Sequence, residues 1–394
     1  MTSIYFDHHS TTPLDERVLH AMMPFLKGKF GNAASRQHGF GWEAEEAVSR
    51  GRKQLADLIG AEPKEIVFTS GATESNNLAI KGVAESYQSK GRHLISCVTE
   101  HPCVIESLKH LEKQGFTVTW ITVDREGRID PTEIQRTVTP QTILVSIMLA
   151  NNEIGTIQSI KEISEIARAN RILFHCDVAQ AVGKISIDVK ELGIDLASVS
   201  AHKFYGPKGI GALYVRSRNP RVKLTPQLDG GGHENGVRSG TLNVPGIVGM
   251  GKAADICRED FEKEVSNMRL LRNKLWDGIR EVCILNGPSP HSEIADLPAR
   301  LPNNLNVRVD GLTADSIMMA MKEYALSSGS ACSSAIPEPS HVLRAIGLSP
   351  EESKSSLRIG LGRSNTMEEV DLFITRFRDV VGKLRTSELS HVAK

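Results

Sequence analysis

The sequence predicts an α/β protein with a large domain built on a mostly parallel sheet and a smaller α+β domain. From about residue 50 to residue 250, short apolar runs alternate with amphipathic stretches, which is the pattern of strands and helices that follow one another along the chain. A length of 394 residues also exceeds the usual limit of a single hydrophobic core, so two domains are expected.

Each strand of the large domain is expected where a short apolar run is bounded by turn or helix signals. Seven such runs occur, at residues 66–69, 93–96, 117–123, 143–149, 172–175, 194–199 and 210–215. Amphipathic periodicity predicts helices between them, at residues 74–88, 103–114, 131–137 and 160–169. Because open α/β sheets bind ligands at the carboxyl ends of their strands, polar residues that follow a strand are candidates for chemistry.

The domain division follows a change of pattern after the glycine-rich segment at residues 230–233. Residues 15–258 are expected to form the large domain, and residues 1–14 and 259–394 the small one. Residues 253–280 are rich in Glu, Lys, Arg and Leu, and they predict one long helix at the junction of the two domains.

The composition argues against several classes of partner. Lys+Arg and Asp+Glu both number 47, so no net field attracts the chain to nucleic acid or to an anionic membrane. No apolar stretch is long enough to span a bilayer, and the N-terminus lacks the basic start and apolar run of a signal peptide. The six cysteines form no C-x-x-C pair and are expected to be free thiols in a cytoplasmic protein.

A lysine follows the strand expected at residues 194–199, in the sequence Ser200-Ala201-His202-Lys203. A turn rich in Gly and Pro comes directly after it, where backbone can approach a ligand closely. A lysine in this position suits a Schiff base with pyridoxal phosphate, and Ser200 and His202 can then hold the phosphate. From these residues alone, a surface lysine on a turn is the alternative.

The turn that opens the helix after residues 66–69 is a candidate anion site. It contains Ala72 and Thr73, and the free amide groups and positive dipole end of a helix N-terminus attract a phosphate. A Gly/Thr turn that only caps its helix is the alternative. Together with Lys203, this turn predicts a phosphate-binding site.

Asp177 closes the apolar run at residues 172–176, with Gln180 three residues later. If a helix starts at Asp177, both side chains share one face. The carboxylate can then pair with a pyridine nitrogen and keep it protonated, while Gln180 bonds the ring hydroxyl. An N-cap aspartate is the alternative.

Three further residues follow strands or stand alone as candidate ligands. His101 can stack on a cofactor ring and move protons near neutral pH. A metal site of Cys97, His101 and Cys103 lacks the paired spacing of zinc ligands, so no metal is predicted. The Asn152 amide can hold a ring substituent or a carboxylate, and Arg358 can clamp a carboxylate, with a surface ion pair as its alternative.

Cys332 stands in the tract Ser-Ser-Gly-Ser-Ala-Cys-Ser-Ser-Ala at residues 327–335, where only small residues surround the thiol. That composition predicts a mobile, exposed loop. A thiol on such a tether suits a sulfur carrier that reaches an enclosed cofactor and then presents sulfur outside. A harmless surface thiol is the alternative, and the other cysteines are interpreted as structural.

Together these segments resemble the cysteine desulfurases, pyridoxal-phosphate enzymes of the class V aminotransferase group. The likeness covers nearly the whole chain, and the tract at residues 327–332 is specific to the subgroup with the longer active-site loop. The matching segments are residues 5–7, 11–13, 68–76, 99–101, 151–155, 177–180, 200–211, 230–234, 238–241 and 327–332.

The resemblance implies the type I fold of pyridoxal-phosphate-dependent transferases and a role for each candidate. The implied cofactor contacts are Lys203 for the Schiff base, His101 for ring stacking, Asp177 for the ring nitrogen, Gln180 and Asn152 for the ring hydroxyl region, and Ala72, Thr73, Ser200 and His202 for the phosphate. Thr241 completes the phosphate site from the neighbouring subunit, which implies a homodimer. Arg358 and Asn152 bind the carboxylate of L-cysteine.

The implied reaction converts L-cysteine to L-alanine and leaves the sulfur on Cys332 as a persulfide. An acceptor protein then takes the sulfur for iron–sulfur cluster assembly, or for thio-cofactor synthesis or tRNA thiolation. The alternatives are a selenocysteine lyase or another lyase or aminotransferase on the same fold, and a non-catalytic scaffold that only binds the cofactor. The loop bearing Cys332 favours the desulfurase, because transamination needs no mobile thiol.

The chain departs from the family's usual pattern at His8-His9 and at Ala33, near the mouth of the expected site. Neither histidine is assigned a catalytic role. The chain also ends soon after its last expected helix, whereas relatives that supply iron–sulfur scaffolds often have a longer tail for docking. The resemblance therefore implies the chemistry and leaves the acceptor open.

Overall fold

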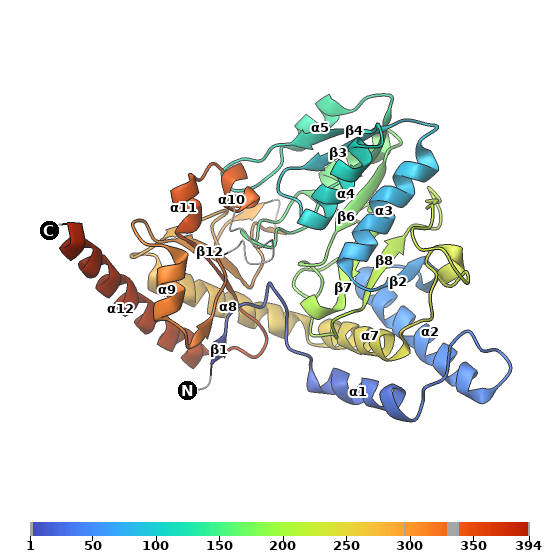
Figure 1. Ribbon diagram of the computed structural model, residues 1–394, viewed down its shortest axis with the longest axis horizontal. Coiled ribbons are helices and arrows are strands. Elements are labelled where there is room, and N and C mark those ends of the chain that lie inside the picture. The colour runs from blue at the N-terminus through green and yellow to red at the C-terminus, as the bar shows by residue number, and fades with distance from the viewer. Residues whose placement is uncertain (1–2, 295–296, 329–338, 393–394) are drawn as a thin grey trace.

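The computed structural model describes residues 3–294, 297–328 and 339–392. Figure 1 shows two units side by side: a large one in which helices cover a sheet, and a smaller one that ends in the long helix α12 (Met367–Val392). Every helix in the described part of the chain is too short or too polar to cross a membrane.

A seven-stranded sheet forms the centre of the large unit, in the order β2-β8-β7-β6-β5-β3-β4. The neighbours are parallel except at β8, which runs antiparallel to both β2 and β7. The strands are β2 (Ile66–Thr69), β3 (His93–Cys97), β4 (Thr117–Ile121), β5 (Thr142–Ser146), β6 (Leu173–Asp177), β7 (Leu196–Ser200) and β8 (Gly211–Val215). The mostly parallel sheet predicted from the sequence is confirmed, although β4 and β5 end earlier than expected.

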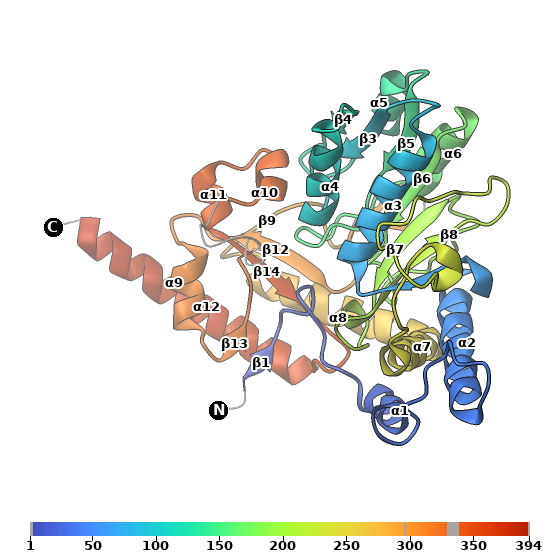
Figure 2. The same cartoon turned by 45° about the vertical axis from the view of Figure 1, so that its right-hand side comes forward.

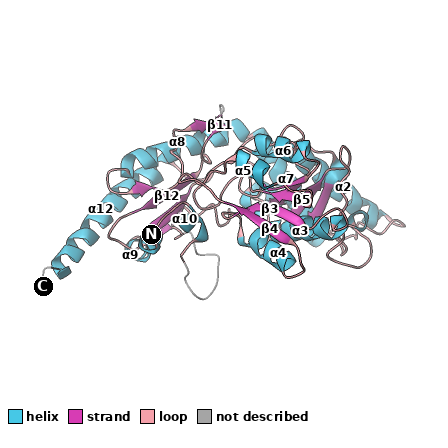
Figure 3. Cartoon of the chain, turned by 90° about the horizontal axis from the view of Figure 1, so that it is seen from above, coloured by secondary structure: helices cyan, strands magenta, loops and turns pink. Residues whose placement is uncertain are grey.

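Helices cover both faces of this sheet, as the view from above shows (Figure 3). In α4 the buried residues Val104, Leu108 and Leu111 recur every three or four positions, so they form one face of the helix. The helices of the large unit are α1 (Glu16–Lys27), α2 (Gly39–Ile59), α3 (Ala72–Tyr87), α4 (Pro102–Glu112), α5 (Pro131–Thr137), α6 (Ile160–Ala169) and α7 (Val244–Glu259).

The smaller unit surrounds a three-stranded antiparallel sheet in the order β14-β12-β9. Phe6, Phe373 and Phe377 are fully buried in its core. Its other elements and bounds are β1 (Ile4–Tyr5), α8 (Phe261–Ile279), β9 (Ile284–Leu285), β10 (Glu293–Ile294), β11 (Leu297–Pro298), β12 (Asn304–Arg308), α9 (Ala314–Ala320), β13 (Tyr324–Ala325), α10 (His341–Ala345), α11 (Pro350–Lys354) and β14 (Ser356–Gly360).

The N-terminal segment connects the two units. Strand β1 pairs in parallel with β13 of the smaller unit, and the chain then crosses to α1, which lies beside α7 of the large one (Figure 2). On the way, residues 9–11 pass the carboxyl ends of the large sheet and line the cavity there. The crossing therefore brings polar groups of the N-terminal segment to the candidate site.

The hydrophobic cores of the two units are largely separate. Residues between 18 and 257, with Leu301, form the cores of the large unit, whereas Phe6 and residues between 271 and 381 form that of the smaller one. A small fourth cluster joins Ile154 to α10. We therefore propose that residues 15–258 form one domain, and that residues 1–14 and 259–394 form the other.

The prediction of a single long helix at residues 253–280 is wrong. Two helices, α7 and α8, occupy this stretch and meet at Asp260. Asp260 has φ −98° and ψ 5°, and its carboxylate pairs with Arg17 of α1 at 3.1 Å. Each helix buries its own apolar face, so the amphipathic pattern continues across the junction and does not reveal the change of direction.

Candidate active site

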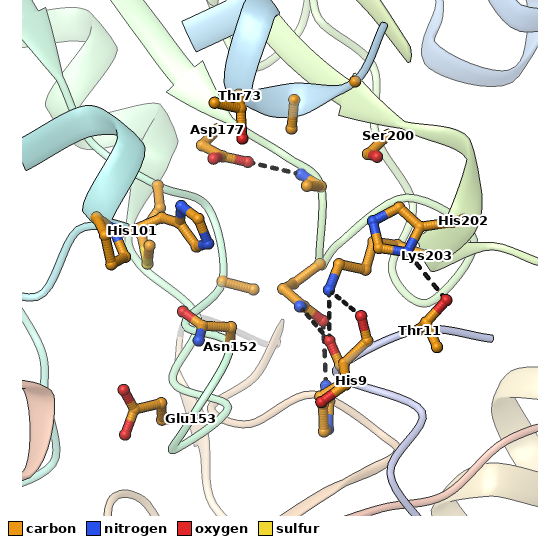
Figure 4. Close-up of a pocket in the computed structure, with 18 of the residues that line it drawn as sticks. His9, Thr11, Thr73, His101, Asn152, Glu153, Asp177, Ser200, His202 and Lys203 are labelled. Carbon is orange, nitrogen blue, oxygen red and sulfur yellow. Dashed lines mark hydrogen bonds between the residues drawn. The ribbon is translucent and has the colours of Figure 1, made fainter. Parts of the chain in front are cut away.

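The predicted site residues gather around one cavity of about 670 Å³ at the carboxyl ends of the large sheet. Figure 4 shows how they lie: Thr73 and Ser200 at one end, His101 and Asn152 at one side, and Lys203 opposite them. The predicted residues that line the cavity are Ala72, Thr73, His101, Asn152, Asp177, Gln180, Ser200, His202, Lys203 and Arg358.

One end of the cavity is built to receive an anion. It is the N-terminus of α3, where the peptide N–H groups and the helix dipole favour negative charge. Gly71 precedes this helix with φ 156°, and a Cβ added to Gly211 would lie 2.5 Å from its Cα, so both positions favour glycine. The hydroxyl-bearing residues Thr73 and Ser200 line the same end of the cavity.

His202 is held beside this end as a neutral imidazole. Its Nδ1 lies 3.0 Å from Thr11 Oγ1, within hydrogen-bond distance. Burial, followed by the nearby Lys203, lowers the His202 pKa to about 4. Near neutral pH the ring therefore carries one proton and can donate one hydrogen bond.

Lys203 lies in the cavity and not on the outer surface, so the surface-lysine alternative is wrong. It ends a single 3₁₀ turn, Ala201–Lys203, that follows the buried strand β7. Its Nζ donates to the main-chain oxygens of His9 at 2.6 Å and Ser10 at 2.8 Å. A second buried lysine, Lys184, donates to the Lys203 carbonyl at 3.0 Å, and burial lowers the Lys184 pKa to about 8.

Asp177 is the last residue of β6 and is 7% exposed. No helix begins there, so the N-cap alternative is wrong and the shared helix face considered for Asp177 and Gln180 does not exist. The reason is local: Asp177 Oδ1 accepts the Ala179 N–H at 2.9 Å, which stabilises a turn. Its Oδ2 accepts from Asn76 Nδ2 at 2.7 Å. The carboxylate nevertheless lines the same cavity as Gln180.

His101 caps α4 with its ring. Its Nδ1 accepts the main-chain N–H of Cys103 at 3.3 Å, which leaves Nε2 to carry the proton of the neutral ring. Burial lowers the His101 pKa, whereas the nearby Asp177 raises it. The ring can therefore stack on a planar ligand and offer an N–H.

Arg358 is 2% exposed, so the alternative of a surface ion pair is wrong. Its guanidinium pairs with Asp7 at 3.0 Å and donates to Ser10 Oγ at 2.7 Å and to the Asn152 carbonyl at 3.1 Å. Its Nε is buried without a hydrogen-bond partner among the described residues. A buried cation with an unused donor suits a carboxylate ligand.

Sequence reasoning missed His9, which holds both ends of the Gln180 amide. His9 Nδ1 lies 3.1 Å from Gln180 Oε1, and Gln180 Nε2 donates to the His9 carbonyl at 3.0 Å. The histidine pair at positions 8 and 9 was the available signal. Its meaning was hidden because Gln180 is 171 residues away along the chain.

Glu153 is a second residue that sequence reasoning missed, although it follows Asn152 directly. It lines the cavity, is 4% exposed and accepts a hydrogen bond from Ser340 Oγ at 2.6 Å. Burial raises the Glu153 pKa to about 7, even though Ser340 and Arg358 act to lower it. The folded protein therefore favours the protonated carboxyl.

The substitution Glu153→Gln is expected to stabilise the protein increasingly as pH rises. With a folded-state pKa above the unfolded value, the parent loses stability as pH rises from about 4.5 to 7, because in this range the unfolded state releases the proton while the folded state still holds it. The difference is about 3 kcal/mol at most, at about 1.4 kcal/mol for each pKa unit. The melting temperatures of both proteins at pH 5.5 and pH 8 measure it, and a gap independent of pH contradicts the prediction.

One described site residue, Thr241, does not line the cavity. Thr241 is exposed and borders a separate hollow of about 90 Å³ beside Arg238, so its predicted contribution to a neighbouring subunit stays a prediction. Cys332 lies outside the described residues. Among the described residues, no three His, Cys, Asp or Glu side chains are grouped to hold a metal ion.

Comparisons with known proteins agree with this geometry. Residues 4–373 match the family model of aminotransferase class-V. A cysteine desulfurase IscS of Anaeromyxobacter dehalogenans is 54% identical over 385 residues, which are 97% of this chain and 93% of that protein. The cysteine desulfurase IscS of Salmonella typhi is 52% identical over 386 residues, with the same coverage.

Solved structures of related proteins superpose on nearly the whole chain. A NifS-like protein superposes with a TM-score of 0.88 at 37% identity, covering 97% of this chain and 100% of the other. A structure of SspA in complex with cysteine superposes with a TM-score of 0.80 at 38% identity, covering 92% of this chain and 100% of the other.

The fold and the site define a pyridoxal-phosphate-dependent enzyme, and the chain belongs to the aminotransferase class-V family. Within that family it is a cysteine desulfurase. The residues of the cavity fit the cofactor, because an anion-binding helix end, a buried carboxylate and a lysine amine match its phosphate, ring nitrogen and aldehyde.

Proposed function

We propose that the protein removes the sulfur of L-cysteine, releases L-alanine and keeps the sulfur as a persulfide on Cys332 for an acceptor protein. The main support is the convergence of Lys203, Asp177 and His101 on one cavity in a chain whose relatives are cysteine desulfurases. The acceptor is proposed to be an iron–sulfur scaffold, or a protein of thio-cofactor synthesis or tRNA thiolation.

The proposal assigns the cofactor to the cavity residues. Bound pyridoxal phosphate supplies an electron sink for charge that develops at the substrate α-carbon. Lys203 would hold the cofactor as a Schiff base, and its Nζ would later take and return the substrate α-proton. The other proposed contacts are Ala72, Thr73, Ser200 and His202 at the phosphate, Asp177 at the ring nitrogen, Gln180 and Asn152 near the ring hydroxyl, and His101 on the ring face.

Arg358 and Asn152 are proposed to hold the substrate carboxylate. Asp7 and Ser10 fix the guanidinium from one side, while its Nε retains an unused donor. A planar donor group in a buried position suits a two-point bond to a carboxylate.

The substitution Arg358→Lys is expected to weaken L-cysteine binding by about 10- to 100-fold, because a charged hydrogen bond is worth about 1.5–3 kcal/mol. Titration of the absorbance change on substrate addition measures it. Cysteamine, which lacks the carboxylate, is the control ligand and should bind both proteins alike. An equal loss for both ligands contradicts the assignment.

The sulfur step is proposed to use the Cys332 thiolate. It forms a bond to the substrate sulfur while the carbon–sulfur bond breaks, and the carbon keeps the electron pair. Cys332 is thereby oxidised to a persulfide and the substrate carbon is reduced. The proton that the thiol gives up is balanced by the one that completes the methyl group of alanine. His101 is proposed to serve the proton transfers of this step, because its Nδ1 accepts the Cys103 N–H and Nε2 is left to carry the ring proton.

A cytoplasmic homodimer is part of the proposal. The five cysteines among the described residues are free thiols, as expected in a reducing compartment. Thr241 is exposed and therefore accessible to a second copy, whose phosphate site it is proposed to complete.

The test of the function is product analysis. Purified protein given L-cysteine should release alanine and form an equal amount of enzyme-bound persulfide sulfur during the first turnover. Pyruvate and ammonia in place of alanine contradict the proposal. A parallel assay with L-selenocysteine decides the alternative, because a selenocysteine lyase would turn over that substrate and leave L-cysteine unchanged.

A further inference from the structure

His9 connects the two domains at the edge of the cavity. Its side chain is 1% exposed and lies between Gln180, after strand β6, and Asn304, at the start of β12. Nδ1 is 3.1 Å from Gln180 Oε1, and Nε2 is 3.1 Å from Asn304 Nδ2. Figure 4 shows the residue beside Lys203, whose Nζ donates to the His9 carbonyl at 2.6 Å.

The direction of each hydrogen bond follows from Arg300. This arginine is 1% exposed, and its guanidinium donates to Asn304 Oδ1 at 2.7 Å. A guanidinium can only donate, so the oxygen of Asn304 faces Arg300 and its NH₂ group faces His9. The same NH₂ group also donates to the Glu153 carbonyl at 3.1 Å. His9 Nε2 must therefore accept.

A neutral His9 then carries its proton on Nδ1 and donates it to Gln180 Oε1. Burial, and next the nearby Arg358, hold the His9 pKa well below its ordinary value, and Lys184 and Lys203 act in the same direction. The hydrogen bond to Gln180 opposes them. The ring therefore stays neutral, with one tautomer.

The tautomer in turn fixes the amide of Gln180. Its oxygen is held by His9 Nδ1, and one N–H of its nitrogen donates to the His9 carbonyl at 3.0 Å. The second N–H of that nitrogen remains for a ligand, since Gln180 lines the cavity. The amide cannot turn its oxygen toward the ligand without breaking both bonds to His9.

We propose that His9 is a positioning residue: the tautomer that Arg300 and Asn304 impose on it makes Gln180 present an N–H, and not its oxygen, to the ring oxygen of the bound cofactor. The inference rests on the proposed function only in that it takes this cavity as the cofactor site. An N–H donated to an anionic ring oxygen stabilises its charge and weakens its hold on the proton shared with the Schiff-base nitrogen. The Schiff base therefore loses its proton at lower pH.

The first test measures the tautomer directly. Protein labelled with ¹⁵N-histidine is studied by NMR, and the His9 signals are assigned by their loss in a His9 variant. The expected result is a proton on Nδ1, none on Nε2, and no titration between pH 6 and 8. A proton on Nε2, or a charged ring in that range, overturns the proposal. This result is independent of any desulfurase activity.

The second test compares two variants of similar polarity. His9→Asn keeps an N–H donor near the place of Nδ1, whereas His9→Gln reaches toward Asn304 and loses the donor to Gln180. The absorbance of the bound cofactor is titrated against pH. We expect the midpoint to rise by about one unit or more in His9→Gln, as the loss of a charged hydrogen bond implies, and by much less in His9→Asn.

Equal midpoints in both variants, shifted or not, overturn the proposal, because a purely structural role of the ring would not distinguish them. The contrast concerns the resting cofactor and needs no turnover. If the protein binds pyridoxal phosphate but releases no alanine, the proposed reaction fails while the role of His9 is still tested.

Discussion

Lys203→Ala is expected to abolish the visible absorbance of the Schiff base and to lower alanine release by at least about 10³-fold. The lysine supplies both the cofactor linkage and the group that moves the α-proton, so its loss removes two functions at once. The nearby Lys184 cannot replace it, because its amine is buried and bonded to the Lys203 carbonyl at 3.0 Å. Absorption spectra and an alanine assay measure the two effects.

The control for this variant is Lys190→Ala, which removes a lysine whose side chain is 51% exposed and pairs with Glu62. It should keep the absorbance band and the turnover of the parent. A band retained in Lys203→Ala contradicts the Schiff-base assignment. A second outcome is that Lys203→Ala binds no cofactor at all. In that case an added free amine should not restore the absorbance band of the parent protein.

Cys332→Ala is expected to keep the cofactor absorbance and to lose alanine release by about 10³-fold or more, since no other thiol is suited to attack the substrate sulfur. Burial raises the pKa of Cys97, Cys103 and Cys283 to about 12 and that of Cys257 to about 11. These thiols stay protonated near neutral pH, and the thiolate is the nucleophile.

The measurements are alanine release and alkylation of the persulfide followed by mass spectrometry. Cys283→Ala is the control, because this thiol lies in the core of the small domain and should be dispensable for turnover. Undiminished alanine release from Cys332→Ala excludes the thiol as the nucleophile. A persulfide found on another cysteine of that variant would identify the replacement.

Much of the large domain was predictable because its signals are local. The helices predicted at residues 131–137 and 160–169 match α5 and α6 residue for residue, since each has a clear start signal and one apolar face. The predictions failed where a single residue decides the geometry. Asp260 divides one amphipathic stretch into two helices, and Asp177 forms a turn where a helix start had been considered.

The candidate site was predictable where it depends on strand ends. Thr73, Asp177 and Lys203 lie just after or at the end of buried strands, and a parallel sheet brings such positions to one edge. His9 and Glu153 were missed because their partners come from elsewhere. Ser340 is 187 residues from Glu153, and no local pattern reports such a pairing.

The sequence by itself determined which chemical groups this protein can use, because the identity of a lysine, a carboxylate or a thiol does not depend on the fold. It also placed most of them at one edge of a sheet through the order of its strands. Only the tertiary structure decided how those groups are protonated and oriented. Asn304, 295 residues from His9, places the proton on that ring and thereby sets the direction of Gln180. A hydrogen-bond direction is a property of neighbours in space, and these neighbours meet only when the two domains pack together.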